Sequence, residues 1–127
     1  EMINQSAMNI DEISLRLWNS ESNLKYLNDT GHIIGLHSHT HPTELKKMSY
    51  SEQTDEYEKN KTILKSIIGG SEIFSMSHPC NSYNDDTLKI LKNMNVHFGF
   101  RANMDFGYNS TLEYPRIDHA LLIDKIK

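Results

Sequence analysis

The sequence has a single cysteine, no excess of positive charge and no long apolar run. Each of these features argues against certain classes of protein. One cysteine (Cys80) among 127 residues excludes an internal disulfide and favours a reducing compartment, so we expect a cytoplasmic rather than a secreted protein. The formal net charge of -4 gives no electrostatic reason to expect binding to nucleic acid or to an anionic membrane. No apolar run approaches the roughly 20 residues that span a bilayer, and the first residues lack the basic-then-apolar pattern of a signal peptide.

What the composition does contain is enough apolar material for one core. With 37% hydrophobic and 24% charged residues, the chain has the composition of a soluble globular domain. We find no internal repeat and no low-complexity linker, so residues 1–127 are expected to form a single domain. Position 1 is Glu rather than Met, which is consistent with an upstream portion.

The most informative stretch, residues 31–42, is an apolar run that ends in three alternating histidines and a proline. Its apolar part is too short for a helix and is bounded by glycines, which predicts a buried strand. Neutral imidazole is the commonest side-chain metal ligand near neutral pH. We therefore expect His37 and His41 to hold a divalent metal, and His39, which alternates with them, to point away. The competing interpretation is a polar loop with solvated histidines.

Spacing along the rest of the chain predicts alternating helices and strands. Ser49 and Glu52 have the spacing of a capping box, and Gly69-Gly70 ends the helix that follows. The inward face of that helix is expected to consist of Tyr57, Ile63, Leu64, Ile67 and Ile68. The expected order is a helix capped by Asn19 or Ser20, a strand over 32–37, a helix over 50–68, a strand over 72–77, a helix capped by Asn84, a strand over 97–102, a strand over 112–117 and a candidate helix over 119–127.

Strands that alternate with helices of this length imply βα units and a parallel sheet, in which the chemistry lies at the carboxyl ends of the strands. The histidine loop and the His78-Pro79-Cys80 segment both follow such ends. His78 fits equally a structural hydrogen-bonding role and a place in the active-site lining. Cys80 is expected to be a small packing residue rather than a nucleophile, because no activating partner is evident. Arg116 and Asp118 fit either a pair at the rim of the site or an ordinary salt bridge.

Several segments together resemble the polysaccharide deacetylase family, the NodB-homology or carbohydrate esterase family 4 domain. Residues 29–42 contain the intact second motif of that family, His-Ser/Thr-x-x-His, and residues 17–27 resemble the segment before it. Residues 77–85 resemble the third motif in the variant Tyr-Pro-Tyr-Gly-x-Tyr-Asn. Residues 95–102 resemble the strand that follows, and residues 114–118 resemble the Pro-Arg-Ile segment near the end of the domain. The resemblance covers about residues 13–118.

The resemblance implies part of a distorted (β/α) barrel and the removal of N-acetyl, occasionally O-acetyl, groups from sugars. In this family an Asp-His-His triad holds zinc or a similar divalent metal, and a neighbouring Asp acts as the base. By the resemblance His37 and His41 are metal ligands, Ser38 braces their loop by hydrogen bonding, and the backbone N–H of Cys80 helps to hold the oxyanion. It also implies catalytic candidates (His78, Asp118 and His119) and residues that line the substrate site (Pro79, Tyr83 and Arg116).

The departures from the family pattern concern the first motif above all. No segment matches the strand that carries the metal-binding Asp and the base, so we expect the N-terminal strands of the barrel to be missing and this chain alone to bind metal weakly and be inactive. Ser77 and Cys80 replace the usual Arg and aromatic residues of the third motif. Two alternatives stay open: a degenerate deacetylase-like scaffold or glycan-binding module, and a PHP-type metal-dependent phosphoesterase. The expected partner is an acetylated sugar or polysaccharide, with self-association possible through an unpaired sheet edge.

Overall fold

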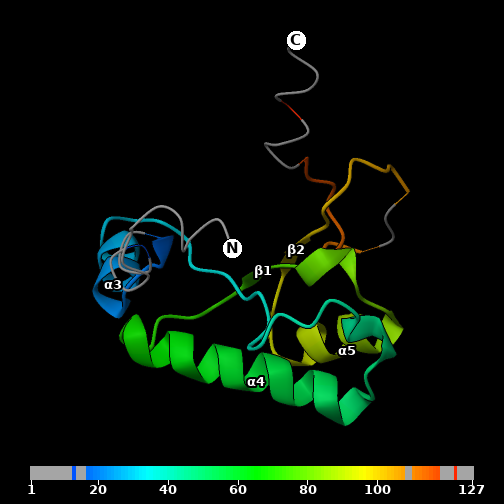
Figure 1. Ribbon diagram of the computed structural model, residues 1–127, viewed down its shortest axis with the longest axis horizontal. Helices are drawn as coiled ribbons and strands as arrows, with labels where there is room; N and C mark the ends of the chain where they lie inside the picture. The colour runs from blue at the N-terminus through cyan, green and yellow to red at the C-terminus, as the bar shows by residue number, and fades with distance from the viewer. Residues whose placement is uncertain (1–12, 14–16, 108–109, 118–121, 123–127) are drawn as a thin grey trace, which may run out of the picture.

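In the computed structural model the chain forms short parallel strands packed on helices, in the order that the sequence predicts (Figure 1). The structure describes residues 13, 17–107, 110–117 and 122. The expected helix over 119–127 lies almost entirely outside these residues. The elements are α3 (Glu21–Asp29), the 3-10 turn η1 (Leu45–Lys47), α4 (Tyr50–Ile67), β1 (Ser75–Ser77), the 3-10 turn η2 (Pro79–Asn81), α5 (Asp85–Asn93) and β2 (Phe98–Phe100).

The sheet is parallel, as predicted, but its strands are shorter than the apolar runs suggested. Strands β1 and β2 pair in parallel, and single parallel bridges add Leu36 beside Met76 and Tyr114 beside Phe100. The expected strands over 32–37 and 112–117 are therefore wrong in length, because each contributes one bridge. The reason is visible beside Leu36. Leu36 makes both of its backbone hydrogen bonds to β1, but the next residue that would face β1 is Ser38, whose left-handed φ of 63° turns the chain out of the sheet.

Helix ends follow the sequence closely. The Ser20 side chain accepts from Asn23 N at the start of α3. Ser49 and Glu52 form the predicted capping box of α4, which stabilises the helix start by satisfying free N–H groups on both sides. Asn84 caps α5 as predicted. One expectation for α4 is wrong: Ile63 is 44% exposed, because it lies outside the inward stripe that Tyr57 and Leu64 define.

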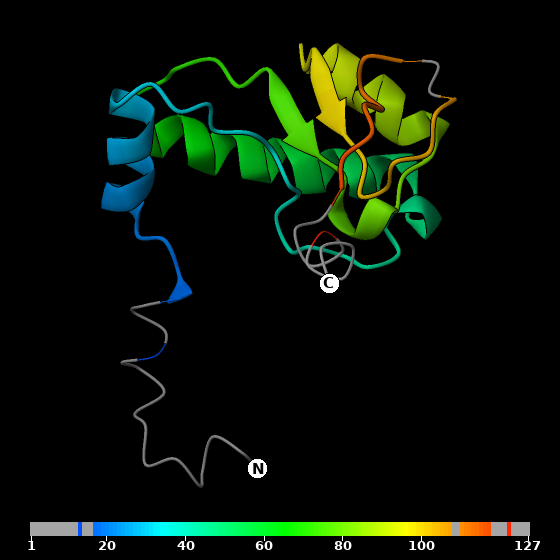
Figure 2. The ribbon, with the colours of Figure 1, turned by 90° about the horizontal axis from the view of Figure 1, so that it is seen from above.

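The core lies between one face of the strands and the helices α4 and α5. Figure 1 shows α4 and α5 on the same side of β1 and β2, and Figure 2 shows the two strands side by side. Helix α3 packs near the C-terminal end of α4 in both views. The core consists of Leu36, Leu45, Tyr57, Ile68, Ile73, Met76, Ile90, Leu91, Val96 and Leu112. Within the described residues, no helix has the length and apolar character that crossing a membrane requires.

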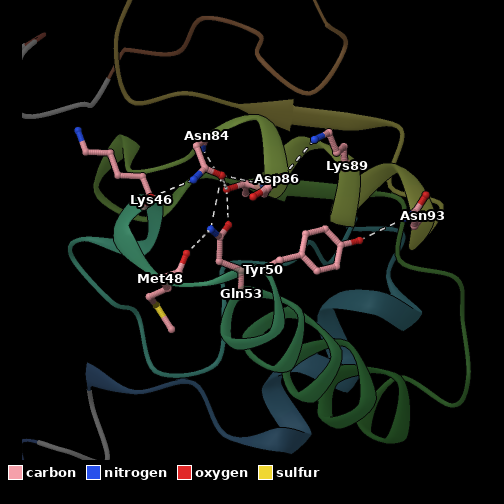
Figure 3. Close-up of polar contacts among 9 residues, drawn as sticks. Lys46, Met48, Tyr50, Gln53, Asn84, Asp86, Lys89 and Asn93 are labelled. Carbon is pink, nitrogen blue, oxygen red and sulfur yellow. Dashed lines mark hydrogen bonds and ion pairs between the residues drawn. The ribbon is translucent and has the colours of Figure 1, made fainter.

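A buried polar network fixes α4 against α5 (Figure 3). Gln53 of α4 donates to Met48 O at 2.9 Å and accepts from the Thr87 hydroxyl at 2.5 Å. Asn84 donates to Lys46 O at 2.9 Å, so η1 is tied to the same cluster. Buried polar groups that find partners on different elements specify how those elements pack, since a slipped helix would leave them unsatisfied. Helix α4 is thereby fixed along its own axis.

Candidate metal centre

The histidine loop leaves the sheet immediately after Leu36 and runs along α4. Its backbone is unusual at two positions, because Ser38 and His41 have φ values of 63° and 56°. L-residues adopt this left-handed region at a cost of about 1–2 kcal/mol each. His37 and His41 are both exposed. The loop therefore presents its imidazoles at the carboxyl end of the sheet, as predicted, in a backbone conformation that the surroundings must hold.

The orientation of His37 is set by hydrogen bonds on both its backbone and its ring. Its N–H donates to Asn60 Oδ1 at 3.0 Å, and its ring Nδ1 lies 2.8 Å from Ser77 O. A carbonyl oxygen only accepts, so Nδ1 carries the proton and Nε2 keeps its lone pair. A ligand histidine whose second nitrogen donates to a backbone carbonyl is the usual arrangement at protein metal sites. His37 fits that arrangement.

His41 lies beside His37, whereas His39 does not share their surroundings. The rings of His37 and His41 have centroids 4.9 Å apart and are tilted by 53°. Two imidazoles bound to one tetrahedral zinc, with Zn–N near 2.0–2.1 Å, have centroids about 5 Å apart. His39 instead lines a hollow against α4 with Asp55, Glu58 and Lys59, among others. The donor set of His37 and His41 thus fits a divalent metal, and His39 lies elsewhere, as expected.

The described residues bring together two candidate ligands and no more. Within the described ranges, no group of three His, Cys, Asp or Glu side chains is placed to hold a metal ion. A catalytic zinc has typically three protein ligands and one open position. The pair therefore needs a further ligand from outside these residues to form a catalytic centre.

Glu56 of α4 holds the part of the loop that lies between the two histidines. Its Oε2 accepts from His39 N at 2.9 Å and from Thr40 N at 2.8 Å, and its Oε1 accepts from Thr40 Oγ1 at 2.8 Å. Burial acts to raise the pKa of Glu56, but the hydrogen bonds from Thr40 and His39 outweigh it and leave the pKa below its usual value. Glu56 is therefore a carboxylate at neutral pH, matched to three donors.

The expected role of Ser38 needs correction. Its hydroxyl is buried, and within the described residues it has no hydrogen-bond partner. Ser38 has a left-handed backbone, and the hydrogen bonds that brace the loop come instead from Glu56 and Asn60. We missed both because we placed the inward face of α4 by its apolar residues alone. The signal was available, since Glu56 and Asn60 flank Tyr57 on the same helical stripe.

Of the two roles predicted for His78, the structure supports the structural one. It is 1% exposed, its ring Nε2 lies 2.8 Å from Leu112 O, and its ring stacks on Tyr83 with centroids 4.0 Å apart. Burial lowers its pKa to about 4, against the opposing effect of the Leu112 carbonyl and Glu113, so the ring is neutral at pH 7. Pro79 is also fully buried, which places it outside the surface that a substrate would contact. Packing under the loop, rather than lining of a site, explains both residues.

Cys80 and Asn81 form a tight left-handed turn directly after them. Their φ values are 50° and 55°, and Asn81 is held by its Oδ1, which accepts from Ala102 N at 3.0 Å. Cys80 is exposed. The part in holding an oxyanion that the resemblance implies for its backbone N–H stays a prediction.

The remaining predicted residues separate into three groups. Arg116 lies at the rim with His37, because its Nη1 contacts Ser77 Oγ at 3.4 Å and both residues line one groove. Tyr83 lies behind the loop, where its hydroxyl donates to Glu113 at 2.9 Å; burial and Glu113 raise its pKa. Asp118 and His119 lie outside the described residues, so the rim pair of Arg116 with Asp118 stays a prediction.

The groove beside His37 follows the sheet face opposite to α4 and α5. It has a volume of about 550 Å³ and is mostly apolar, with His37, Arg116, Ser75 and Ser77 as its polar lining. Its apolar lining consists of Ile33, Leu36, Phe74, Met76, Phe98 and Phe100. A half-open apolar groove with convergent polar groups at one end has the general character of a ligand site.

Comparison with known proteins agrees with this geometry. The family model described as polysaccharide deacetylase matches residues 5–99. No curated protein matches the sequence. Among solved structures, the Streptococcus pyogenes deacetylase PplD in complex with acetate has a TM-score of 0.70 at 22% identity, and the match covers 98% of this chain and 54% of PplD. This chain therefore spans about half the length of that relative.

Two further structures share the fold. The deacetylase domain of BpsB from Bordetella bronchiseptica has a TM-score of 0.67 at 12% identity, covering 79% of this chain and 48% of that domain. BA3943 from Bacillus anthracis, a CE4 family pseudoenzyme, has a TM-score of 0.56 at 24% identity, covering 60% of this chain and 26% of its own. The helices and parallel strands are thus part of a (β/α) barrel of the deacetylase type. The chain belongs to the polysaccharide deacetylase family.

Proposed function

We propose that the chain is the later part of a metal-dependent deacetylase domain that hydrolyses the N-acetyl amide of a sugar or polysaccharide in a cell-surface glycan. The observation that carries the proposal is the His37–His41 pair. The two rings lie 4.9 Å apart at the carboxyl end of the sheet, with the His37 tautomer fixed by Ser77 O. The PHP-type phosphoesterase is no longer a competitor, because the family match identifies a different class of hydrolase.

His37 and His41 would hold the cation, most simply zinc. A divalent cation supplies, when bound, activation of a water molecule and polarisation of the acetyl carbonyl. The chain's own part is orientation: Nδ1–H of His37 donates to Ser77 O and aims Nε2 outward. Three residues after Ser77, in a left-handed turn, the Cys80 N–H would donate to an oxygen that gains negative charge during amide hydrolysis. Ser77 thereby connects the ligand loop to the oxyanion loop.

The third ligand and the base are proposed to come from outside the described residues. Within these residues only two candidate ligands converge, and the chain spans about half of PplD. The 127-residue chain alone is therefore expected to bind a divalent metal weakly and to lack deacetylase activity. Robust deacetylation by this chain alone would contradict the proposal.

The groove beside His37 is the proposed site for the acetylated sugar. Arg116 can donate hydrogen bonds to sugar hydroxyl or carbonyl oxygens at its rim, and the aromatic rings of Phe98 and Phe100 offer apolar surface. Self-association of this chain would occur through the sheet edge at Leu36, which contributes a single bridge beside β1.

A second candidate function is a catalytically degenerate scaffold or glycan-binding module. Two observations favour it: the ligand set of the described residues is incomplete, and Ser77 and Cys80 replace the usual residues of the third motif. The fold is also shared with BA3943, a CE4 family pseudoenzyme. A scaffold has no need of the two imidazoles, so the same experiment separates the two functions.

The experiment compares His37→Ala and His41→Ala with a matched control, His39→Ala. Isothermal titration with Co²⁺ or Zn²⁺ alone should show weakened binding in the first two variants and unchanged binding in the control, because His39 lies against α4. In a longer protein that contains this chain, deacetylation of an acetylated glycan should fall by at least about 100-fold in the same two variants. Full activity without either imidazole would reject the metal mechanism and support the scaffold.

A further inference from the structure

The loop that carries the two histidines is held almost entirely by two polar side chains of one helix. Between His37 and Thr40, the backbone N–H groups of three residues donate to α4 side chains rather than to a strand. Asn60 receives the first, and Glu56 receives the other two together with the Thr40 hydroxyl. Glu56 and Asn60 are one helical turn apart, so they form a two-point attachment along α4.

Glu56 binds the segment between the two strained positions of the loop. Ser38 precedes the bonded residues and His41 follows them, and both have left-handed φ values. Such conformations persist only where the surroundings hold them. Because His41 is itself left-handed, releasing residues 39 and 40 would let its backbone relax and move its ring away from His37.

The chemistry at position 56 suits this task better than a neutral side chain would. A carboxylate only accepts hydrogen bonds, and all three groups that reach Glu56 are donors. Hydrogen bonds to an ionised acceptor are roughly twice as strong as neutral ones, and Glu56 is 9% exposed, so water competes little. The helix beneath is fixed by its capping box and by Gln53, which makes it a rigid support.

We propose that Glu56 is the positioning residue of the His37–His41 site, with Asn60 as its assistant: the carboxylate holds the loop in the one conformation in which both imidazoles reach a single divalent cation. The inference rests on the proposed function, since it assumes that the pair binds a metal. It adds to the metal centre a residue of α4 that lies outside the histidine motif.

The test uses Co²⁺ as the probe, titrated into the 127-residue chain by calorimetry and by visible absorption. Glu56→Ala should weaken Co²⁺ binding by about 10–100-fold and change the absorption bands, because the ligand geometry is lost. Glu56→Gln should lie between Glu56→Ala and the parent, since an amide oxygen still accepts from the two N–H groups. The matched control is Glu58→Gln, an exposed carboxylate on the same helix, which should bind as the parent does. In the metal-free chain, amide exchange at His39 and Thr40 should accelerate in Glu56→Ala alone.

Two outcomes would overturn the inference without touching the proposed function. Binding within twofold of the parent and unchanged bands in Glu56→Ala, while His37→Ala and His41→Ala lose binding, would show that the loop needs no support from α4. If Glu56→Ala does not fold, Glu56→Gln and Thr40→Val decide, and parental affinity in both would reject the inference. Unchanged binding in His37→Ala and His41→Ala would instead reject the metal site itself.

Discussion

Burial of a neutral imidazole at position 78 should make the stability of this domain depend on pH in a way that one substitution removes. The pKa of His78 is about 4 in the folded chain, against 6.5 for the free side chain, because burial disfavours the charged ring. Among the groups that act on it, Glu113 favours the charge, whereas Arg101 and His37 oppose it. Since the folded pKa is depressed, the unfolded chain binds the extra proton between these two values. The contribution of His78 to the free energy of unfolding is therefore fully present near pH 7 and is lost as the pH falls from 6.5 towards 4.

The magnitude follows from the two pKa values by linkage. At pH 5, protonation of His78 stabilises the unfolded chain by about 2 kcal/mol and the folded chain hardly at all. Below pH 4 the difference between the two states reaches about 3 kcal/mol. The matched variant is His78→Gln, whose amide can donate to Leu112 O but cannot titrate. Urea unfolding at pH 7 and pH 5 gives the free energy of unfolding for both proteins. The parent should lose about 2 kcal/mol more than the variant over this interval, and an equal loss in both would refute the assignment of a buried neutral ring.

Two further predictions concern the scaffold. Ser49→Ala should lower the free energy of unfolding by about 1 kcal/mol, since the capping box of α4 is lost, whereas Ser51→Ala on the same exposed turn should change it little; equal effects in thermal melts would contradict the cap. Gly99→Ala should destabilise by about 3 kcal/mol or prevent folding, because a Cβ at Gly99 would overlap the backbone of Leu112. A soluble Gly99→Ala protein with the parental melting temperature would show that Gly99 and Leu112 do not lie this close together.

Local chemistry made the helices predictable. The Ser49–Glu52 spacing and the Asn84 cap depend on neighbours within one turn, and both appear in the structure as expected. Strand length was not predictable in the same way, because it depends on which distant group each backbone N–H meets. Beside β1 the ladder ends at Ser38, whose left-handed backbone belongs to a loop that Glu56 and Asn60 hold from a distant helix.

For the site, the sequence identified the imidazole pair but not its support. The His-Ser/Thr-x-x-His motif singles out His37 and His41, and the structure brings these two rings together while His39 lies against α4. The role of Ser38 could not be predicted, because the loop turns through left-handed residues and leaves its hydroxyl without a partner among the described residues. The burial of His78 was equally hidden, since it depends on a carbonyl at Leu112.

Position 41 is where the fold and the chemistry favour different residues. A backbone with φ of 56° is adopted most readily by glycine or asparagine, so the most stable chain would not carry histidine there. The imidazole is present at a cost in stability of about 1–2 kcal/mol, which a library selected only for folding would tend to remove. Natural proteins can retain such residues where activity requires them, at a cost in stability. Among the histidines of the described residues, backbone geometry alone distinguishes His41, which fits its proposed role as a ligand.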